Sequence, residues 1–404
     1  MKITNQLLRA KPFIYKIAFY LMVLSLLLVG CYKGIGEDGG KDAQWFPAKL
    51  FSDNIDFYHF YLENFNDWFM RSVPNYYFQL YYLLYPFSSV SWDTFKIIWF
   101  LINAAFLLLF VLQVKKNFNF SYKKMVIIFL PFVLGFPLLS VFTNGQSTLL
   151  ILIFIYFSWK FRDNQFLLPI FLSLLTIKYS FGIPIIFGFL LMGYYRSVLL
   201  SGVLTLVFPL IYSIQFNLKF LPTIFLPLKV ATSSSSNPIG SGPGDIMSLY
   251  GLLTDKPLLG INILTIGLTI FIILFAFLSF KYHVDKKSIF TCSLLFSLFG
   301  FFHFGQAYVL FLLIIPLLYD TKYFKFLYGY LLLFCTSPRI VRILNLLFNQ
   351  EIDVKEFMRD KYFVIFNIII LLSFFVLVLL DGILKREKSR INSAHSIKSL
   401  LNIS

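Results

Sequence analysis

The sequence has few charged side chains, and acids are the scarcer kind. Only 13% of its 404 residues are charged, with 19 Asp and Glu against 35 Lys and Arg. Soluble domains have roughly 25% charged residues. Here 58% of the residues are hydrophobic and 20% are aromatic. This composition excludes a water-soluble globule and indicates a protein with many membrane spans.

Cysteine is also scarce, and several motifs are missing. The three cysteines indicate no disulfide framework, because Cys31 follows the first apolar run, Cys292 lies inside another and Cys335 lies near the end of a third. There is no Gly-rich phosphate loop, no Cys/His cluster with metal-ligand spacing and no Ser-His-Asp order. We therefore expect neither a metal nor a cofactor, and an enzyme of this kind would need an already activated substrate.

Cys31 allows two interpretations. It ends the run Leu28-Val29-Gly30-Cys31, which resembles a lipoprotein cleavage box after a basic N-terminus. The favoured alternative is a small-residue exit from an uncleaved first helix, because a chain with many later spans needs no lipid anchor.

The apolar runs predict an all-α protein. Many approach the roughly 20 residues needed to cross a membrane, and they lack the alternation of barrel strands. The pattern predicts about 12 spans, at 12–30, 94–114, 125–142, 147–160, 165–179, 181–195, 197–215, 259–280, 288–302, 305–319, 323–336 and 362–384.

The net charge of +16 is explained by Lys and Arg in cytoplasmic loops, so no nucleic-acid partner is predicted. The charge rule places both termini in the cytoplasm and makes 31–93 the first external loop. Within it, the run 76–87 is short and bounded by prolines, which favours helices lying in the interface.

We expect one transmembrane domain over 1–384. It has a flexible external loop at 216–258, a last external loop at 337–361, and a basic cytoplasmic tail at 385–404.

Polar residues at membrane depth are costly, so they are functional candidates. The predicted topology brings four sets to the outer face: Asp42 with Gln44 and Trp45, the turn Asn144-Gly145-Gln146, Lys178, and His303. Each also has an ordinary interpretation. Asn-Gly favours tight turns, a lysine near an interface extends to water, and a lone histidine is more often structural. Their common location indicates one polar cavity.

Arg339 and Arg342 follow Pro338 on the predicted outer side, against the charge rule. Arginine is a multiply donating partner for an anionic lipid phosphate. General contact with lipid head groups is the alternative.

These residues together resemble glycosyltransferase family 87, polyprenyl-phosphate-sugar-dependent enzymes of the GT-C superfamily related to α-1,2-mannosyltransferases. The resemblance extends from about residue 40 to 310. It rests on Asp42-x-Gln44-Trp45-x-Pro47-Ala48, Pro74-Asn75-Tyr76, Asn144-Gly145-Gln146 and Lys178. The sequence departs from the family at Phe46, at Tyr179, and at Asn54-Ile-Asp56-Phe-Tyr58, which bears on the sugar and the acceptor.

The resemblance implies a GT-C-like bundle with interfacial helices in the first external loop. It also implies a hexosyltransferase of the bacterial cytoplasmic membrane whose active site faces outward. Asp42 would be the base, and Lys178 would hold the phosphate of the polyprenyl-phosphate sugar. The other expected substrate-binding residues are Gln44, Trp45, Asn75, Tyr76, Asn144, Gln146, His303, Arg339 and Arg342.

The acceptor would be a glycan or glycolipid hydroxyl, with inversion at the anomeric carbon. The alternative is a transporter, a lipid flippase or a polysaccharide export component. A transporter should place its polar residues near the midplane and in paired halves, whereas here they gather at one face.

Overall fold

The computed structural model describes residues 2–37, 39–40, 43–64, 73–235, 263–300, 305–348, 352 and 361–401. The regular structure of these residues is helical, and no strand occurs among them. The expected all-α class is therefore confirmed, and the apolar helices fit a membrane-embedded protein.

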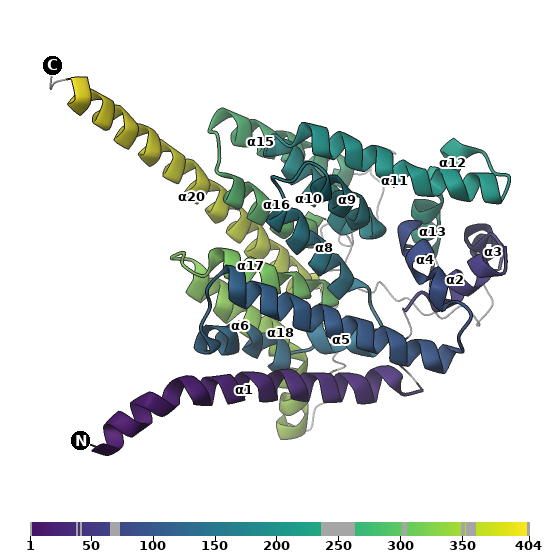
Figure 1. Cartoon of the computed structure of the whole chain (residues 1–404), viewed down its shortest axis with the longest axis horizontal. Helices are drawn as coiled ribbons and strands as arrows, with labels where there is room; N and C mark the ends of the chain where they lie inside the picture. Colours follow the sequence, from purple (N-terminus) through teal and green to yellow (C-terminus); the bar gives the residue numbers. More distant parts are fainter. Residues whose placement is uncertain are drawn as a thin grey trace.

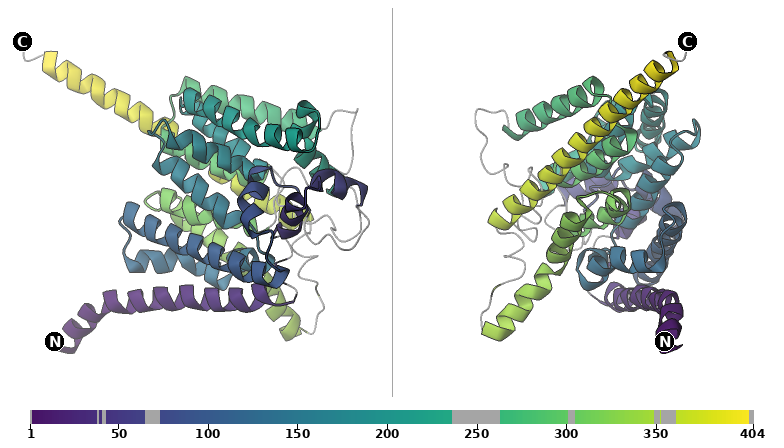
Figure 2. Two further views of the ribbon diagram at one scale, coloured as in Figure 1. Left: turned by 45° about the vertical axis from the view of Figure 1, so that its right-hand side comes forward. Right: turned by 90° about the vertical axis from the view of Figure 1, so that its left-hand side faces the viewer.

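Long helices form the frame of the molecule (Figure 1). They are α1 (Lys2–Ile35), α5 (Trp92–Asn117), α11 (Tyr195–Gln215), α15 (Ile263–Lys281), α18 (Phe324–Phe348) and α20 (Lys361–Leu401). The start of α1 and the end of α20 lie at the same end of the bundle, on the left of Figure 1 and of the left view in Figure 2. We call this the terminal end, and the opposite one the loop end.

By length and composition, six described helical stretches could cross a membrane, and the bent pair α6 (Tyr122–Leu134) and α7 (Pro137–Asn144) would make a seventh. The expected 12 spans are thus not reached within the described residues. The stretch expected as one span at 125–142 is this pair, whose axes meet at 60°. Pro137 begins α7 and Gly135 ends α6 in extended backbone, which explains the break.

One of the six stretches, Leu167–Leu191, is folded back on itself. Tyr194 after it donates its hydroxyl to the Asp163 carboxylate before it, at 3.0 Å. A straight helix of this length would hold those residues about 35 Å apart. The chain turns at Lys178, whose φ of −119° and ψ of 89° are not helical.

The fold-back divides the stretch into α9 (Leu167–Leu175), a 3-10 turn η2 (Thr176–Lys178) and α10 (Tyr179–Leu191). A Cβ on Gly182 would lie 2.6 Å from the Leu175 carbonyl oxygen, so glycine allows the close approach. The arms are about 14 and 20 Å long, against roughly 30 Å of hydrocarbon. The stretches expected as spans at 165–179 and 181–195 are therefore the two arms of one hairpin, the α9–α10 hairpin, and each arm is shorter than a hydrocarbon core is thick.

Other helices are also shorter than a membrane is thick. The helix expected at 147–160 is α8 (Thr148–Lys160), about 20 Å long. The remaining helices in this part of the chain are α16 (Lys286–Gly300), the 3-10 helix η3 (Gly305–Leu310) and α17 (Phe311–Leu318). The helix α8 ends shortly before Asp163, where the α9–α10 hairpin also begins and ends. Because α8 and the hairpin arms have similar lengths, the first residue of α8 and the hairpin tip lie at similar distances from the terminal end.

The first loop forms a compact group of short helices at the loop end. They are α2 (Trp45–Ser52), α3 (Phe57–Glu63), α4 (Gln79–Leu84) and the 3-10 helix η1 (Tyr85–Phe87). In Figure 1 they lie between the ends of α5 and α11. The run at 76–87 is thus a short helix, as expected. The Asp56 carboxylate caps α3 and accepts a 2.6 Å hydrogen bond from the Tyr212 hydroxyl on α11.

The two other expected external loops begin differently. In the segment 216–258, α12 (Phe220–Ile224) and α13 (Leu226–Ser235) are helical, and 236–258 lies outside the described residues. The segment 337–361 is helical as far as Phe348, within α18. Pro338 removes an amide donor, and the Ser337 hydroxyl donates to the freed carbonyl of Phe334 at 2.8 Å. The tail expected from 385 continues α20 as far as Leu401.

Candidate functional site

Two of the predicted site residues, Asp42 and His303, lie outside the described residues. The chain beside residues 41–42 is nevertheless fixed on the Asn144-Gly145-Gln146 turn. The Gly40 amide donates to the Thr143 carbonyl oxygen at 2.8 Å. On the other side, a Cβ on Gly145 would come within 2.8 Å of the Ala43 Cβ.

Gly145 is required here for two reasons. Its φ of +66° is the left-handed conformation that favours glycine, and it ends α7. The close approach of Ala43 leaves no room for a side chain. The Gly145 carbonyl oxygen accepts a 2.7 Å hydrogen bond from the indole nitrogen of Trp99 on α5. This bond fixes the turn to α5.

Tyr76 connects the first loop to the turn and to Lys178. Its hydroxyl donates to the Gln146 Oε1 at 3.1 Å. Its ring centroid lies 5.6 Å from the Lys178 ammonium, which also lies 5.2 Å from the ring of Phe181. The next residue, Tyr77, donates its amide to the Ile177 carbonyl oxygen at 2.9 Å. We call Tyr76, Gln146 and Lys178 the Tyr76 junction.

Burial differs among the three residues of the Tyr76 junction. Tyr76 and Gln146 are each 2% exposed, so their mutual hydrogen bond is removed from water. Lys178 is half-buried at the tip of the α9–α10 hairpin. An ammonium at this depth is costly, and aromatic faces offset part of that cost, about 0.5–2 kcal/mol each.

Gln44 is fully buried, and its side chain connects two parts of the first loop by hydrogen bonds. Its Nε2 donates to the Val73 carbonyl oxygen at 3.0 Å, and its Oε1 accepts from the Tyr81 hydroxyl at 3.0 Å. It precedes α2 with a φ of +55°, an uncommon value for a residue other than glycine. Tyr58, whose ring centroid lies 5.9 Å from that of Tyr81, donates its hydroxyl to the Tyr76 carbonyl oxygen at 2.7 Å.

Trp45 is half-buried between aromatic rings of α5. Its ring centroid lies 5.7 Å from that of Trp92 and 6.5 Å from that of Phe95. No described residue accepts a hydrogen bond from its buried Nε1. A buried indole donor without an acceptor costs free energy, which makes it a candidate to donate to a substrate oxygen.

Asn75 and Asn144 are half-buried at the edges of the junction. The Asn75 amide donates to the Val73 carbonyl oxygen at 2.8 Å, which makes a tight turn before Tyr76. Asn144 donates its Nδ2 to the Ser140 hydroxyl at 3.0 Å, within its own helix.

Arg339 and Arg342 are exposed on α18. Within the described part of the chain, neither arginine contacts a residue of the Tyr76 junction. The structure therefore groups six predicted residues around the junction (Gln44, Asn75, Tyr76, Asn144, Gln146 and Lys178), and the two arginines are not among them.

Several polar residues near the site were not predicted from the sequence. Trp99 holds the turn, Tyr81 holds Gln44, and the Gln79 Nε2 donates to the Thr176 hydroxyl of η2 at 3.0 Å. Gln79 is fully buried. Of these residues, Gln79 could have been noticed in the sequence, because it is a glutamine inside the apolar run 76–87.

Burial raises the pKa of Tyr77 to about 12. The phenol beside the hairpin tip therefore stays neutral at physiological pH. Within the described residues, no three His, Cys, Asp or Glu side chains come together in an arrangement that could hold a metal ion.

No family model, curated protein or solved structure matches the chain. The likeness to glycosyltransferase family 87 therefore rests on the motifs in the sequence.

Proposed function

We propose that this chain is an integral membrane glycosyltransferase that moves a hexose from a polyprenyl-phosphate sugar to a hydroxyl of a glycan or glycolipid. The observation that supports it most is the Tyr76 junction. One tyrosine connects the first loop, the Asn144-Gly145-Gln146 turn and Lys178, the segments that carry the resemblance. Their separation along the chain makes this meeting a non-trivial result of the fold.

The short helices suit a lipid-linked donor. The hairpin tip and the start of α8 lie roughly 20 Å from the terminal end, inside a hydrocarbon core of roughly 30 Å. A polyprenyl chain can remain in the bilayer while its phosphate reaches Lys178. The sugar and the acceptor hydroxyl then meet beneath the first loop.

In this mechanism Asp42 accepts the proton of the acceptor hydroxyl. The hydroxyl oxygen attacks the anomeric carbon, and the bond from that carbon to the phosphate oxygen breaks. The leaving polyprenyl phosphate gains negative charge, which the Lys178 ammonium stabilises. One displacement from the opposite face inverts the anomeric carbon, and neither a metal nor a cofactor is needed.

The remaining residues divide by burial. Gln44 and Gln146 are buried and bonded within the protein, so we assign them to positioning the loop and the turn. Trp45, Asn75 and Asn144 are half-buried and suit direct contact with sugar hydroxyls. His303 keeps the role of a sugar contact, and Arg339 and Arg342 would bind the lipid phosphate or head groups before transfer.

A transporter or flippase is the second candidate, and one observation favours it. Broken and re-entrant helices, such as α6–α7 and the α9–α10 hairpin, are typical of transporters, where they surround a substrate site near the midplane. A polysaccharide export component would share this feature.

The decisive experiment uses the purified full-length protein with a radiolabelled polyprenyl-phosphate hexose and a set of candidate acceptors. We expect a labelled product that requires both substrates. Asp42→Asn should lower turnover by about 10²- to 10⁴-fold, the usual contribution of a general base. Asp53→Asn is the control, since Asp53 forms only a surface ion pair with Lys49.

The same protein in liposomes tests the alternative. Movement of the labelled lipid between leaflets without product, unchanged in Asp42→Asn, would favour a flippase and contradict the enzyme. Full turnover by a folded Asp42→Asn variant would remove Asp42 from the mechanism.

A further inference from the structure

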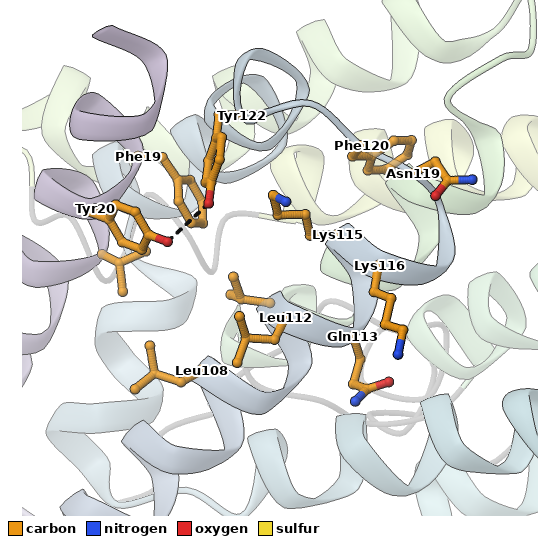
Figure 3. A pocket seen from close by; sticks show the side chains of 12 residues that line it. Phe19, Tyr20, Leu108, Leu112, Gln113, Lys115, Lys116, Asn119, Phe120 and Tyr122 are labelled. Atoms are coloured by element: carbon orange, nitrogen blue, oxygen red, sulfur yellow. Dashed lines mark hydrogen bonds between the residues drawn. The ribbon is translucent and has the colours of Figure 1, made fainter. Parts of the chain in front are cut away.

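A groove opens near the terminal end of the bundle, and none of the residues of the Tyr76 junction lines it. Figure 3 shows the side chains that line this groove. It lies between α1, the last turns of α5 and the start of α6, and its volume is about 820 Å³. Small-molecule sites have roughly 300–1,000 Å³. The proposed transfer reaction assigns no role to this groove.

The inner part of the groove is apolar. Phe19 and Val23 of α1 and Val111 of α5 are buried in its floor. Leu108 and Leu112 form a wall on one face of α5 and are 43% and 61% exposed. In a membrane such a surface is covered by hydrocarbon chains.

The rim of the groove is cationic. Lys115 extends over the ring of Tyr122, with its ammonium 4.6 Å from the ring centroid, while Lys116 points away from it beside Gln113 (Figure 3). The Gln113 Oε1 accepts a 2.9 Å hydrogen bond from Lys160, which adds another cation nearby. No carboxylate is among the described residues that line the groove.

Two hydroxyls complete the rim. The Tyr20 and Tyr122 oxygens lie 3.1 Å apart and close the groove between α1 and α6. Phenolic groups above an apolar wall are typical of the membrane interface. Along the groove, leucines are followed by tyrosines and then by lysines. This order matches a lipid, whose apolar acyl chain leads to a polar, charged head group.

We propose that this groove binds one anionic glycerophospholipid of the leaflet at the terminal end. Its acyl chain lies along Leu108 and Leu112, its phosphate is held by Lys115 at the rim, and Lys116 adds positive charge nearby. The charge decides the occupant. Several cations without a carboxylate favour a head group of net negative charge over a zwitterionic one, because each lysine near such a charge contributes about fivefold in binding.

The charge is tested by native mass spectrometry of the delipidated full-length protein in detergent. Phosphatidylglycerol and phosphatidylcholine with the same acyl chains are titrated in parallel. We expect the first phosphatidylglycerol to bind at least about tenfold more tightly. The double variant Lys115→Gln, Lys116→Gln should lose that preference. The control Lys281→Gln, Lys322→Gln removes two exposed lysines elsewhere and should keep it.

The apolar wall is tested by a second pair of variants on the same face of α5. Leu112→Trp fills the groove and should weaken the first binding event by about tenfold. Leu101→Trp is the control, because Leu101 is 58% exposed and does not line the groove. This pair leaves the lysines intact, so it still tests the site if the double lysine variant fails to fold.

Three results would overturn the proposal. Equal binding of the two lipids excludes charge selection. Equal binding by both tryptophan variants shows ordinary annular lipid. Displacement of phosphatidylglycerol by an equimolar polyprenyl phosphate assigns the groove to the donor lipid instead. None of these readouts depends on sugar transfer, so the outcome is separate from the fate of the proposed enzyme.

Discussion

The two ends of the bundle hold their polar residues in opposite ways. At the loop end, Tyr76 and Gln146 are buried and bonded to each other, and Lys178 is half-buried against aromatic rings. At the terminal end, Lys116 is exposed and Lys115 lies over a tyrosine ring at the rim of an open groove.

This difference separates two kinds of energetics. A buried group that loses its partner keeps the full cost of desolvation, about 1–3 kcal/mol, whereas an exposed lysine can be replaced with little effect on folding. Substitutions at the loop end should therefore change stability and transfer together. Substitutions at the terminal end should change lipid binding alone.

The largest effect on stability is expected for Gly145→Ala. The new methyl group meets Ala43, which adds about 1–3 kcal/mol of overpacking to the left-handed strain of about 1–2 kcal/mol. Gly193→Ala is the matched control, since Gly193 has a φ of +87° and open space around its Cβ position. Unfolding in detergent measures both, and equal losses would show that the loop does not press on the turn.

Lys178→Gln should lower sugar transfer by about 10²-fold, because the leaving phosphate loses its cation in a site of low dielectric. Lys116→Gln at the terminal end should leave the rate unchanged. Initial rates with the labelled donor compare the two variants. A similar decrease in both would mean that charge in general, and not the position of Lys178, supports the reaction.

Tyr76→Phe should cost about 1–3 kcal/mol, since the buried Gln146 Oε1 loses the hydrogen bond from the Tyr76 hydroxyl. Tyr85→Phe, an exposed position in the same loop, should cost much less. Thermal unfolding midpoints test the pair. Midpoints that fall equally would contradict the buried hydrogen bond.

The smallest effect concerns high pH. The pKa of Tyr77 is raised to about 12 by burial, from an ordinary value of about 10. Its stabilising contribution is complete below pH 10 and is lost as the pH rises through about 12. Tyr77→Phe should therefore unfold less steeply between those pH values. Identical alkaline profiles for variant and wild type would show that Tyr77 is not desolvated when folded.

The helical class and the meeting of loop, turn and lysine could be predicted from the sequence. Lys and Arg asymmetry placed the first loop, the Asn144-Gly145-Gln146 turn and Lys178 on one side, and the structure brings them together at Tyr76. The residues that hold the loop could not be found in this way. Gln44 bonds to Tyr81 and Val73, and no local pattern reveals partners so distant along the chain.

The turn between the two arms of the α9–α10 hairpin was predicted from the sequence, whereas the close packing at that turn was not. The apolar runs 165–179 and 181–195 were separated beside Lys178, but hydropathy counts residues and does not show how closely two arms approach each other. The turn at Lys178 depends on the close approach that Gly182 allows, which is a tertiary property. Pro338 likewise indicated a helix end, but a serine hydroxyl satisfies the carbonyl that it frees, and α18 continues.

The central claim is that Asp42 and Lys178 face one chamber large enough for a sugar, and cross-linking tests it most directly. Cysteines would replace both residues in a variant without Cys31, Cys292 and Cys335. We predict that a bifunctional thiol reagent about the length of a hexose joins them in native membranes. If each cysteine reacts with a monofunctional reagent but no such linker connects the pair, the proposed chemistry is contradicted.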